Sequence, residues 1–206
     1  MTIFDLLFIA TFLFASGSAL AAVVLLMWRR NAAAKRMLLA LIAYLSVYFG
    51  VLIATSNLSK QRHVAMGEIQ CFDDWCLRVV DVAYVAAPKP GNTLAIVTME
   101  VSNRGRARAQ SEPQTFVYIV DDREHTYWQS MEAQAEYERL HARTRALTSM
   151  IAAGDAISAK QVFELPKSGG HLALIIGHPF GPGFFVIGDS DSFLHKRTIV
   201  PLPNVP

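Results

Sequence analysis

Two cysteines are the most reactive side chains in this sequence. Cys71 and Cys76 enclose the four residues Phe-Asp-Asp-Trp, a separation that suits a disulfide closing a tight turn. Thiolates also bind soft metal ions, but a metal site would need ligands from elsewhere, and the spacing is not that of a zinc ribbon. The pair therefore favours a disulfide in an oxidising compartment, with a metal or dithiol site as the alternative.

Two histidines could complete that alternative site. His178 and His195 both follow the cysteines and, with Cys71 and Cys76, would supply four ligands for a metal such as copper. The sequence shows no nucleophile elbow and no glycine-rich phosphate loop. We therefore expect a protein that is not an enzyme, with no catalytic residue and no cofactor.

The N-terminal quarter of the chain determines where this chemistry takes place. The stretches 6–28 and 37–58 contain no charged residue. A helix needs about 20 apolar residues to cross roughly 30 Å of hydrocarbon, and both stretches reach that length. They predict a transmembrane hairpin over 1–58, with helices at 6–28 and 37–58 and a loop at 29–36. A signal peptide would need a basic start and a shorter apolar core.

The connecting loop predicts the orientation of this hairpin. It carries Arg29, Arg30, Lys35 and Arg36, and Lys and Arg near the ends of membrane helices favour the cytoplasm. We therefore expect a multi-pass protein of a bacterial inner membrane, with its N-terminus and its C-terminal domain in the periplasm.

The first apolar stretch contains a run of small residues. This run is Ala15, Ser16, Gly17, Ser18 and Ala19. Small residues let helix backbones approach closely in lipid, so the run could pack on the second helix or dock onto another membrane subunit. The absence of carboxylate and histidine side chains deep in either stretch argues against a transporter.

Charge is distributed unevenly along the chain. Residues 1–66 contain six Lys or Arg and one acidic residue, whereas the remainder contains 13 Lys or Arg and 16 Asp or Glu. The C-terminal domain is therefore mildly acidic, although the whole chain has a net charge of +2. This distribution argues against a nucleic-acid partner, which requires a basic face on the folded domain.

The region after the hairpin is expected to be an all-β domain. A linker at 59–66 leads to a domain at 67–202, which an extended tail follows at 203–206. Alternating apolar residues and Gly- or Pro-containing turns predict short strands, and strong helix formers predict a surface helix within 130–148. The predicted strands are 78–84, 93–102, 115–120, 156–165, 172–176, 184–187 and 194–202, and the chain is expected to turn at 121–124 and return over 125–128. In 78–84 the residue Val80 interrupts the alternation. In 93–102 the more apolar face, which should face the core, consists of Ala95, Val97, Met99 and Val101. In 115–120 one face consists of Phe116, Tyr118 and Val120. Many short strands separated by turns are typical of an antiparallel sandwich.

Several of these stretches resemble a family of bacterial extracytoplasmic immunoglobulin-like domains of unknown function. The resemblance covers about 67–202 and rests on 94–103 (LAIVTMEVSN), 116–121 (FVYIVD), 153–155 (AGD) and 162–166 (VFELP). The segments 71–76 and 187–196 resemble a membrane-anchored subgroup. The resemblance implies an immunoglobulin-like β-sandwich behind a membrane anchor and supplies no catalytic residues.

Two functional hypotheses follow from these features. The first is a non-enzymatic accessory or scaffolding subunit, which binds the integral membrane subunits of a larger respiratory or photosynthetic complex and braces its periplasmic face. The second is a periplasmic metal-binding or thiol-redox module that uses Cys71 and Cys76, with His178 or His195.

Overall fold

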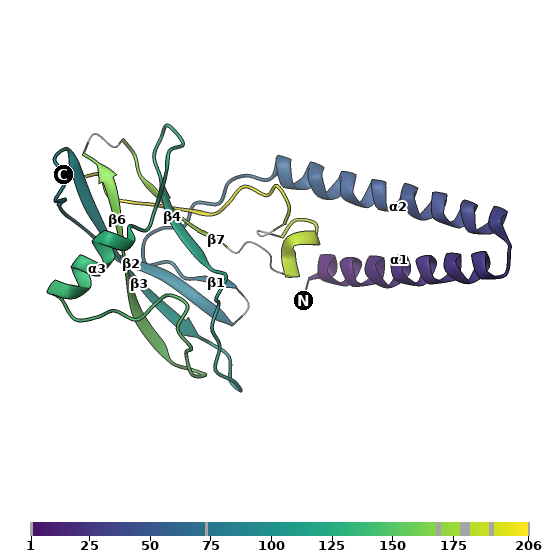
Figure 1. Cartoon of the computed structure of the whole chain (residues 1–206), viewed down its shortest axis with the longest axis horizontal. Coiled ribbons are helices and arrows are strands. Elements are labelled where there is room, and N and C mark those ends of the chain that lie inside the picture. Colours follow the sequence, from purple (N-terminus) through teal and green to yellow (C-terminus); the bar gives the residue numbers. More distant parts are fainter. Residues whose placement is uncertain (1, 73, 168–169, 178–181, 190–191, 206) are drawn as a thin grey trace. The chain divides into compact units, whose positions relative to one another are not determined.

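The computed structural model describes residues 2–72, 74–167, 170–177, 182–189 and 192–205, which form two compact units (Figure 1). The first unit is Met1–Lys60 with Phe180–Lys196, and the second is Gln61–Pro179 with Arg197–Pro206. The predicted domain at 67–202 included the segment around 183–196, which the structure groups with the helices instead.

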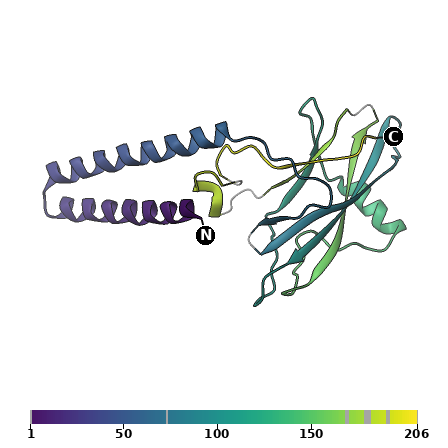
Figure 2. The same cartoon turned by 180° about the vertical axis from the view of Figure 1, so that it is seen from behind.

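The first unit contains an antiparallel helical hairpin, seen from behind in Figure 2. Helix α1 spans Ile3–Met27 and helix α2 spans Asn31–Leu58. At about 1.5 Å per residue, these helices are roughly 38 and 42 Å long. Both are apolar enough to cross a membrane, and only 11% of each apolar window is buried. A core helix of a soluble protein would be mostly buried.

The connection between the helices is shorter than the predicted loop at 29–36. Helix α2 already begins at Asn31, so Lys35 and Arg36 are helical. The residues Ala32 to Ala34 are the strongest helix formers and extend the helix into the charged stretch. Arg29 adopts a φ of 57°, and the chain reverses over Trp28 to Arg30.

The second unit consists of two four-stranded antiparallel sheets (Figure 1). The first sheet has the order β1-β2-β3-β6 and the second has the order β5-β4-β7-β8. The strands of the first sheet are β1 (Gln70–Phe72), β2 (Trp75–Ala86), β3 (Asn92–Asn103) and β6 (Ala156–Pro166). Those of the second are β4 (Phe116–Val120), β5 (Thr126–Trp128), β7 (Ala173–Gly177) and β8 (Ile199–Pro201).

One hydrophobic core joins the inner faces of the two sheets. From β3 it receives the alternating residues Ala95, Val97, Met99 and Val101, which the sequence pattern assigned to the core. The second sheet contributes the side chains Val117, Ile119, Leu174, Ile176 and Val200. The shared core confirms the predicted antiparallel two-sheet arrangement. The break in alternation at Val80 corresponds to a bulge between Val79 and Asp81.

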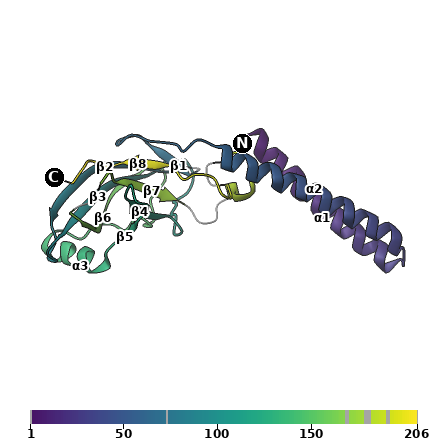
Figure 3. The ribbon, with the colours of Figure 1, turned by 90° about the horizontal axis from the view of Figure 1, so that it is seen from above.

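The outer edge of β6 is capped by a helix side chain. Helix α3 (Met131–Leu140) begins after Ser130, whose hydroxyl accepts a hydrogen bond from Ala133 N–H, and α3 lies next to β6 (Figure 3). Gln134 Oε1 accepts from Val162 N–H at 3.0 Å, and Gln134 Nε2 donates to Lys160 O at 3.3 Å. The side-chain amide thus pairs with the strand as a neighbouring backbone would, which protects an exposed edge.

The prediction of a strand at 184–187 is wrong. Residues Pro182–Phe185 form a short 3-10 helix, η1, in the unit that contains the hairpin. A short apolar run carries no periodicity that separates a strand from a buried turn, so the sequence pattern could not decide between them.

Candidate protein-binding surface

The outward face of the second sheet carries a row of aromatic side chains. Phe116 and Tyr118 project from β4, and Trp128 projects from β5, directly opposite Tyr118 in the strand register. Arg197, two residues before β8, lies against this row. We call Phe116, Tyr118, Trp128 and Arg197 the aromatic surface.

The rings of the aromatic surface form one continuous platform. The Phe116 and Tyr118 rings are stacked with their centroids 5.9 Å apart. The Trp128 ring lies 4.8 Å from that of Tyr118 and 6.2 Å from that of Phe116. The guanidinium carbon of Arg197 lies 4.7 Å from the Phe116 centroid, within the range of a cation–π contact.

A glycine makes this arrangement possible. Gly177 of β7 pairs with Phe116 in register. A Cβ atom at position 177 would lie 2.6 Å from the Phe116 ring and 2.9 Å from the Arg197 side chain. Because no side chain projects from Gly177, the ring and the guanidinium can both lie over this part of the sheet.

The turn between β4 and β5 fixes the register that places Tyr118 opposite Trp128. Asp121 Oδ1 accepts hydrogen bonds from the N–H groups of Arg123 and His125, and its Oδ2 contacts His125 Nδ1 and the Tyr127 hydroxyl. Desolvation raises the pKa of Asp121, but these hydrogen bonds outweigh it and bring the pKa to about 2. Asp121 is therefore ionised and holds the turn closed at neutral pH.

The composition of the aromatic surface suits protein recognition. Trp, Tyr and Arg are the residues most enriched among the side chains that dominate the binding energy of protein interfaces. Trp128 is 58% exposed, and Phe116 and Tyr118 are half-buried. A partner could therefore bury the remaining ring surface, while the neighbouring core residues Val117 and Ile119 keep the platform rigid.

Sequence reasoning placed Phe116 and Tyr118 on one face of a strand but did not identify this surface. The missing residues were Trp128, which lies on β5, and Arg197, which lies just before β8. Alternation within 116–120 predicts which β4 side chains share a face. The residues that lie opposite them on other strands depend on the strand register, which the sequence of a short strand does not determine.

The predicted disulfide between Cys71 and Cys76 is confirmed in the structure. The two residues are directly opposite each other in the β1–β2 hairpin, with their Cα atoms 4.0 Å apart. Cys71 is exposed, whereas Cys76 is buried. The bond ties the start of the sandwich to β2, next to the fully buried Trp75.

The described residues around these cysteines do not form the alternative metal site. Both sulfur atoms are bonded to each other, and His195 Nδ1 contacts the Lys196 carbonyl oxygen at 2.9 Å. His178 lies outside the described residues. Within the described part of the chain, no three His, Cys, Asp or Glu side chains are grouped so that they could hold a metal ion.

The small-residue run of α1 faces two directions. Ala15 and Ser18 are half-buried on the side of α1 that also carries the buried residues Thr11 and Ala22. On this side the Thr11 and Tyr44 hydroxyl oxygens lie 2.9 Å apart, which joins α1 to α2. The remaining members, Ser16, Gly17 and Ala19, are exposed.

Helix α2 carries a second exposed row of small residues that sequence reasoning missed. Ser46, Gly50 and Ala54 recur every four residues and are exposed. A Cβ atom at Gly50 or at Gly17 would meet no atom within 4 Å. Both glycines therefore leave open space on the hairpin surface, which another helix could approach closely in lipid.

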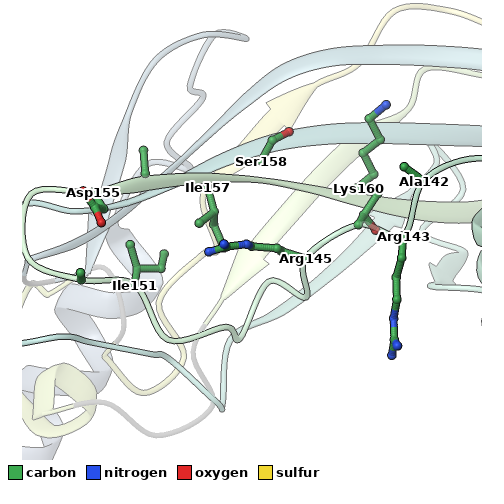
Figure 4. A pocket seen from close by; sticks show the side chains of 11 residues that line it. Ala142, Arg143, Arg145, Ile151, Asp155, Ile157, Ser158 and Lys160 are labelled. Atoms are coloured by element: carbon green, nitrogen blue, oxygen red, sulfur yellow. The ribbon is translucent and has the colours of Figure 1, made fainter.

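A shallow groove lies beside the edge of β6 (Figure 4). It has a volume of about 510 Å³ and is lined by parts of 142–145 and 151–160. Arg145 reaches along it towards Ile157, whereas Arg143 and Lys160 point in opposite directions. The Lys160 ammonium instead lies 3.2 Å from the Tyr137 hydroxyl. These basic side chains do not converge on one ligand position.

No protein-family profile and no curated protein matches the sequence. Solved structures with some likeness include a conserved hypothetical protein from Bacillus anthracis, at 16% identity and a TM-score of 0.46, covering 54% of this chain and 88% of that one. An uncharacterised β-sandwich protein from Clostridium difficile matches at 9% identity and a TM-score of 0.45, covering 70% and 96%. A secreted protein from Mycobacterium tuberculosis matches at 10% identity and a TM-score of 0.44, covering 70% of this chain and 99% of that one. At these values the likenesses carry no conclusion about this chain.

Proposed function

We propose that this protein is a non-enzymatic accessory subunit of a larger membrane complex. In this proposal α1 and α2 span a bacterial inner membrane, the charged turn near Arg29 faces the cytoplasm, and an immunoglobulin-like sandwich lies in the periplasm. The sandwich braces the periplasmic face of a partner, for which a respiratory or photosynthetic complex is our working candidate.

The observation that carries the proposal is the aromatic surface. It combines Tyr, Trp, Phe and Arg on a rigid sheet and leaves most of Trp128 exposed. Protein interfaces use such side chains as anchors because they bury a large area with few rotatable bonds. A folded partner domain that packs its apolar surface on Trp128 would gain most of its binding energy there.

The hairpin supports the same proposal from the membrane side. Two helices have much surface left for lipid or for other helices, and their exposed glycines lie in small-residue rows. In lipid, helices associate through close packing at such rows, because lipid tails are as apolar as leucine side chains. We propose that Gly17, with its exposed neighbours Ser16 and Ala19, docks onto a helix of the partner, and that Gly50 offers a second contact.

Co-purification from native membranes in mild detergent tests the proposal. We expect an integral membrane partner at fixed stoichiometry, with less partner recovered after Trp128→Ala or Gly17→Leu. Matched controls are Met150→Ala, which removes an exposed apolar side chain elsewhere on the sandwich, and Val23→Leu, which adds bulk elsewhere on α1. Recovery of the wild-type protein only as a free monomer, or equal loss in the controls, would count against the proposal.

A thiol-redox module is the second candidate function, and the exposure of Cys71 favours it. An incoming thiolate could reach the sulfur of Cys71, form a mixed disulfide with it, and release Cys76 as the leaving thiolate. The midpoint potential of the pair decides this question. A structural disulfide has a potential below about −300 mV, whereas a more oxidising value would favour redox exchange.

A further inference from the structure

Besides its two helices, the hairpin unit contains a further, largely apolar element that also carries Asp189 and Ser192. It consists of residues 182–189 and 192–194 and includes three phenylalanines, Phe184, Phe185 and Phe193. We call it the aromatic segment. The segment lies between β7 and β8 in the chain, yet it belongs to the hairpin unit rather than to the sandwich.

The aromatic segment is attached to both helices. The Tyr48 hydroxyl donates a hydrogen bond to the Phe185 carbonyl oxygen at 2.7 Å. The Phe185 ring lies 6.5 Å from the Phe8 ring on α1 and 6.2 Å from the Phe49 ring on α2. Further along α2, Ile187 packs in a buried cluster with Tyr48 and Leu52.

One polar pair completes this attachment. The hydroxyl oxygens of Ser56 and Ser192 lie 2.9 Å apart, and both residues are buried. The contacts thus follow one side of α2 over two turns, from Tyr48 to Ser56. They are made by side chains within the apolar helix rather than by residues of a connecting loop.

The position of these contacts along α2 gives the depth of the segment. Tyr48 lies ten residues before the end of α2 at Leu58, which is about 15 Å along the axis. If the 42 Å helix is centred on a 30 Å hydrocarbon layer, about 6 Å projects at each end. Tyr48 then lies roughly 9 Å below the surface of the hydrocarbon, and Phe185 lies beside it.

Non-helical backbone survives at this depth only where its polar groups are satisfied within the protein. In the aromatic segment, Val186 N–H donates to Gly183 O, and Phe193 N–H donates to Phe184 O. The Phe185 carbonyl oxygen accepts from Tyr48, as described above. These bonds satisfy part of the segment's backbone polarity within the protein.

We infer that the aromatic segment inserts into the outer leaflet of the membrane, where phospholipid acyl chains cover Phe185, Phe193 and Leu194. These three side chains are exposed in the hairpin unit. Aromatic residues are favoured where hydrocarbon meets headgroups. The segment is thus a membrane-embedded return of the chain that fixes the sandwich to the bilayer at a second point. This inference rests on the proposed membrane-spanning hairpin.

Site-directed spin labelling of the full chain in phospholipid nanodiscs tests this inference. Separate nitroxide labels are placed through Phe193→Cys in the segment, Ile42→Cys on α2 and Met150→Cys on the sandwich. The three native side chains are 42%, 60% and 63% exposed. The native cysteines are joined in a disulfide and do not react with the label. Frequent collision of the nitroxide with dissolved oxygen indicates that the label lies in lipid. Frequent collision with a water-soluble nickel chelate indicates that it lies in water.

At positions 193 and 42 we expect more frequent collision with oxygen than with the nickel chelate. At position 150 we expect the opposite. Nickel-dominated collisions at 193, with position 42 still in lipid, would overturn the inference but leave the hairpin standing. Low collision with both reagents at 193 would also overturn it, because protein would then cover the segment. A water-exposed label at 42 would overturn the proposed membrane span itself. Leu194→Cys repeats the measurement without removing the Phe184–Phe193 ring contact.

Discussion

Replacing Gln134 with methionine should destabilise the sandwich measurably. Gln134 is 8% exposed, and its amide satisfies both Val162 N–H and Lys160 O on the outer edge of β6. Methionine has a similar length and keeps the apolar contacts of the side chain, but its thioether sulfur is too weak an acceptor to replace the amide oxygen at Val162 N–H. Val162 is fully buried, so water cannot replace the lost partner.

The loss of folding free energy follows from the unsatisfied N–H group of Val162. A buried N–H that loses its acceptor costs about 1–3 kcal/mol. For a domain of this size, that corresponds to a fall in Tm of roughly 4–12 °C. The loss should be local, so the Val162 amide should exchange its hydrogen faster than the amides of β3, which lies on the other side of β6.

Thermal unfolding of the full chain in nanodiscs, followed by tryptophan fluorescence, measures the Tm. Hydrogen exchange read by mass spectrometry on peptides covering 156–166 measures the local effect. The control is Gln114→Met, because Gln114 is exposed. Equal Tm values for Gln134→Met and wild type, with unchanged exchange at Val162, would refute the idea that this side chain stabilises the strand edge.

Three further predictions concern the sandwich. Replacing Cys71 and Cys76 with serine should cost about 2 kcal/mol for so short a loop, and a reductant should lower the Tm of wild type but not of the double variant. The depressed pKa of Asp121 means that its stabilisation is present above about pH 4 and is lost as the pH falls through about 2. Asp121→Asn should therefore lower the Tm at pH 7, with a difference from wild type that shrinks towards pH 2. Gly177→Ala should displace the Phe116 ring and cost about 1–3 kcal/mol, which near-UV circular dichroism and Tm would detect; an unchanged aromatic spectrum would contradict the close approach.

The amino-acid pattern was sufficient for the regular parts of the fold. The two apolar stretches, the strand at 93–102 and the disulfide each follow from local rules: length in hydrocarbon, period-two alternation and cysteine separation. The inner face of β3 could be assigned from alternation because small polar or charged residues such as Thr98 and Glu100 occupy its other face.

The features that the pattern missed depend on contacts between distant residues. The sequence pattern predicts a strand at 184–187, whereas the structure has η1 there, next to Tyr48. The contact with Tyr48 joins residues more than 130 positions apart, and a local sequence pattern carries no information about such a partner. Trp128 joins Tyr118 only through the register of a turn that Asp121 fixes. Lys35 and Arg36 are charged but helical, because the alanines before them favour helix more strongly than the charges oppose it.

Photo-crosslinking at the aromatic surface tests the central claim most directly. Benzoylphenylalanine in place of Tyr118, in the full chain in native membranes, would lie between Phe116 and Trp128. We predict a single adduct with an integral membrane protein, which Trp128→Ala abolishes and which the same photoreactive residue at Met150 does not form. If the surface forms no adduct, or if the adduct persists after Trp128→Ala, the aromatic surface is not the docking site of an accessory subunit.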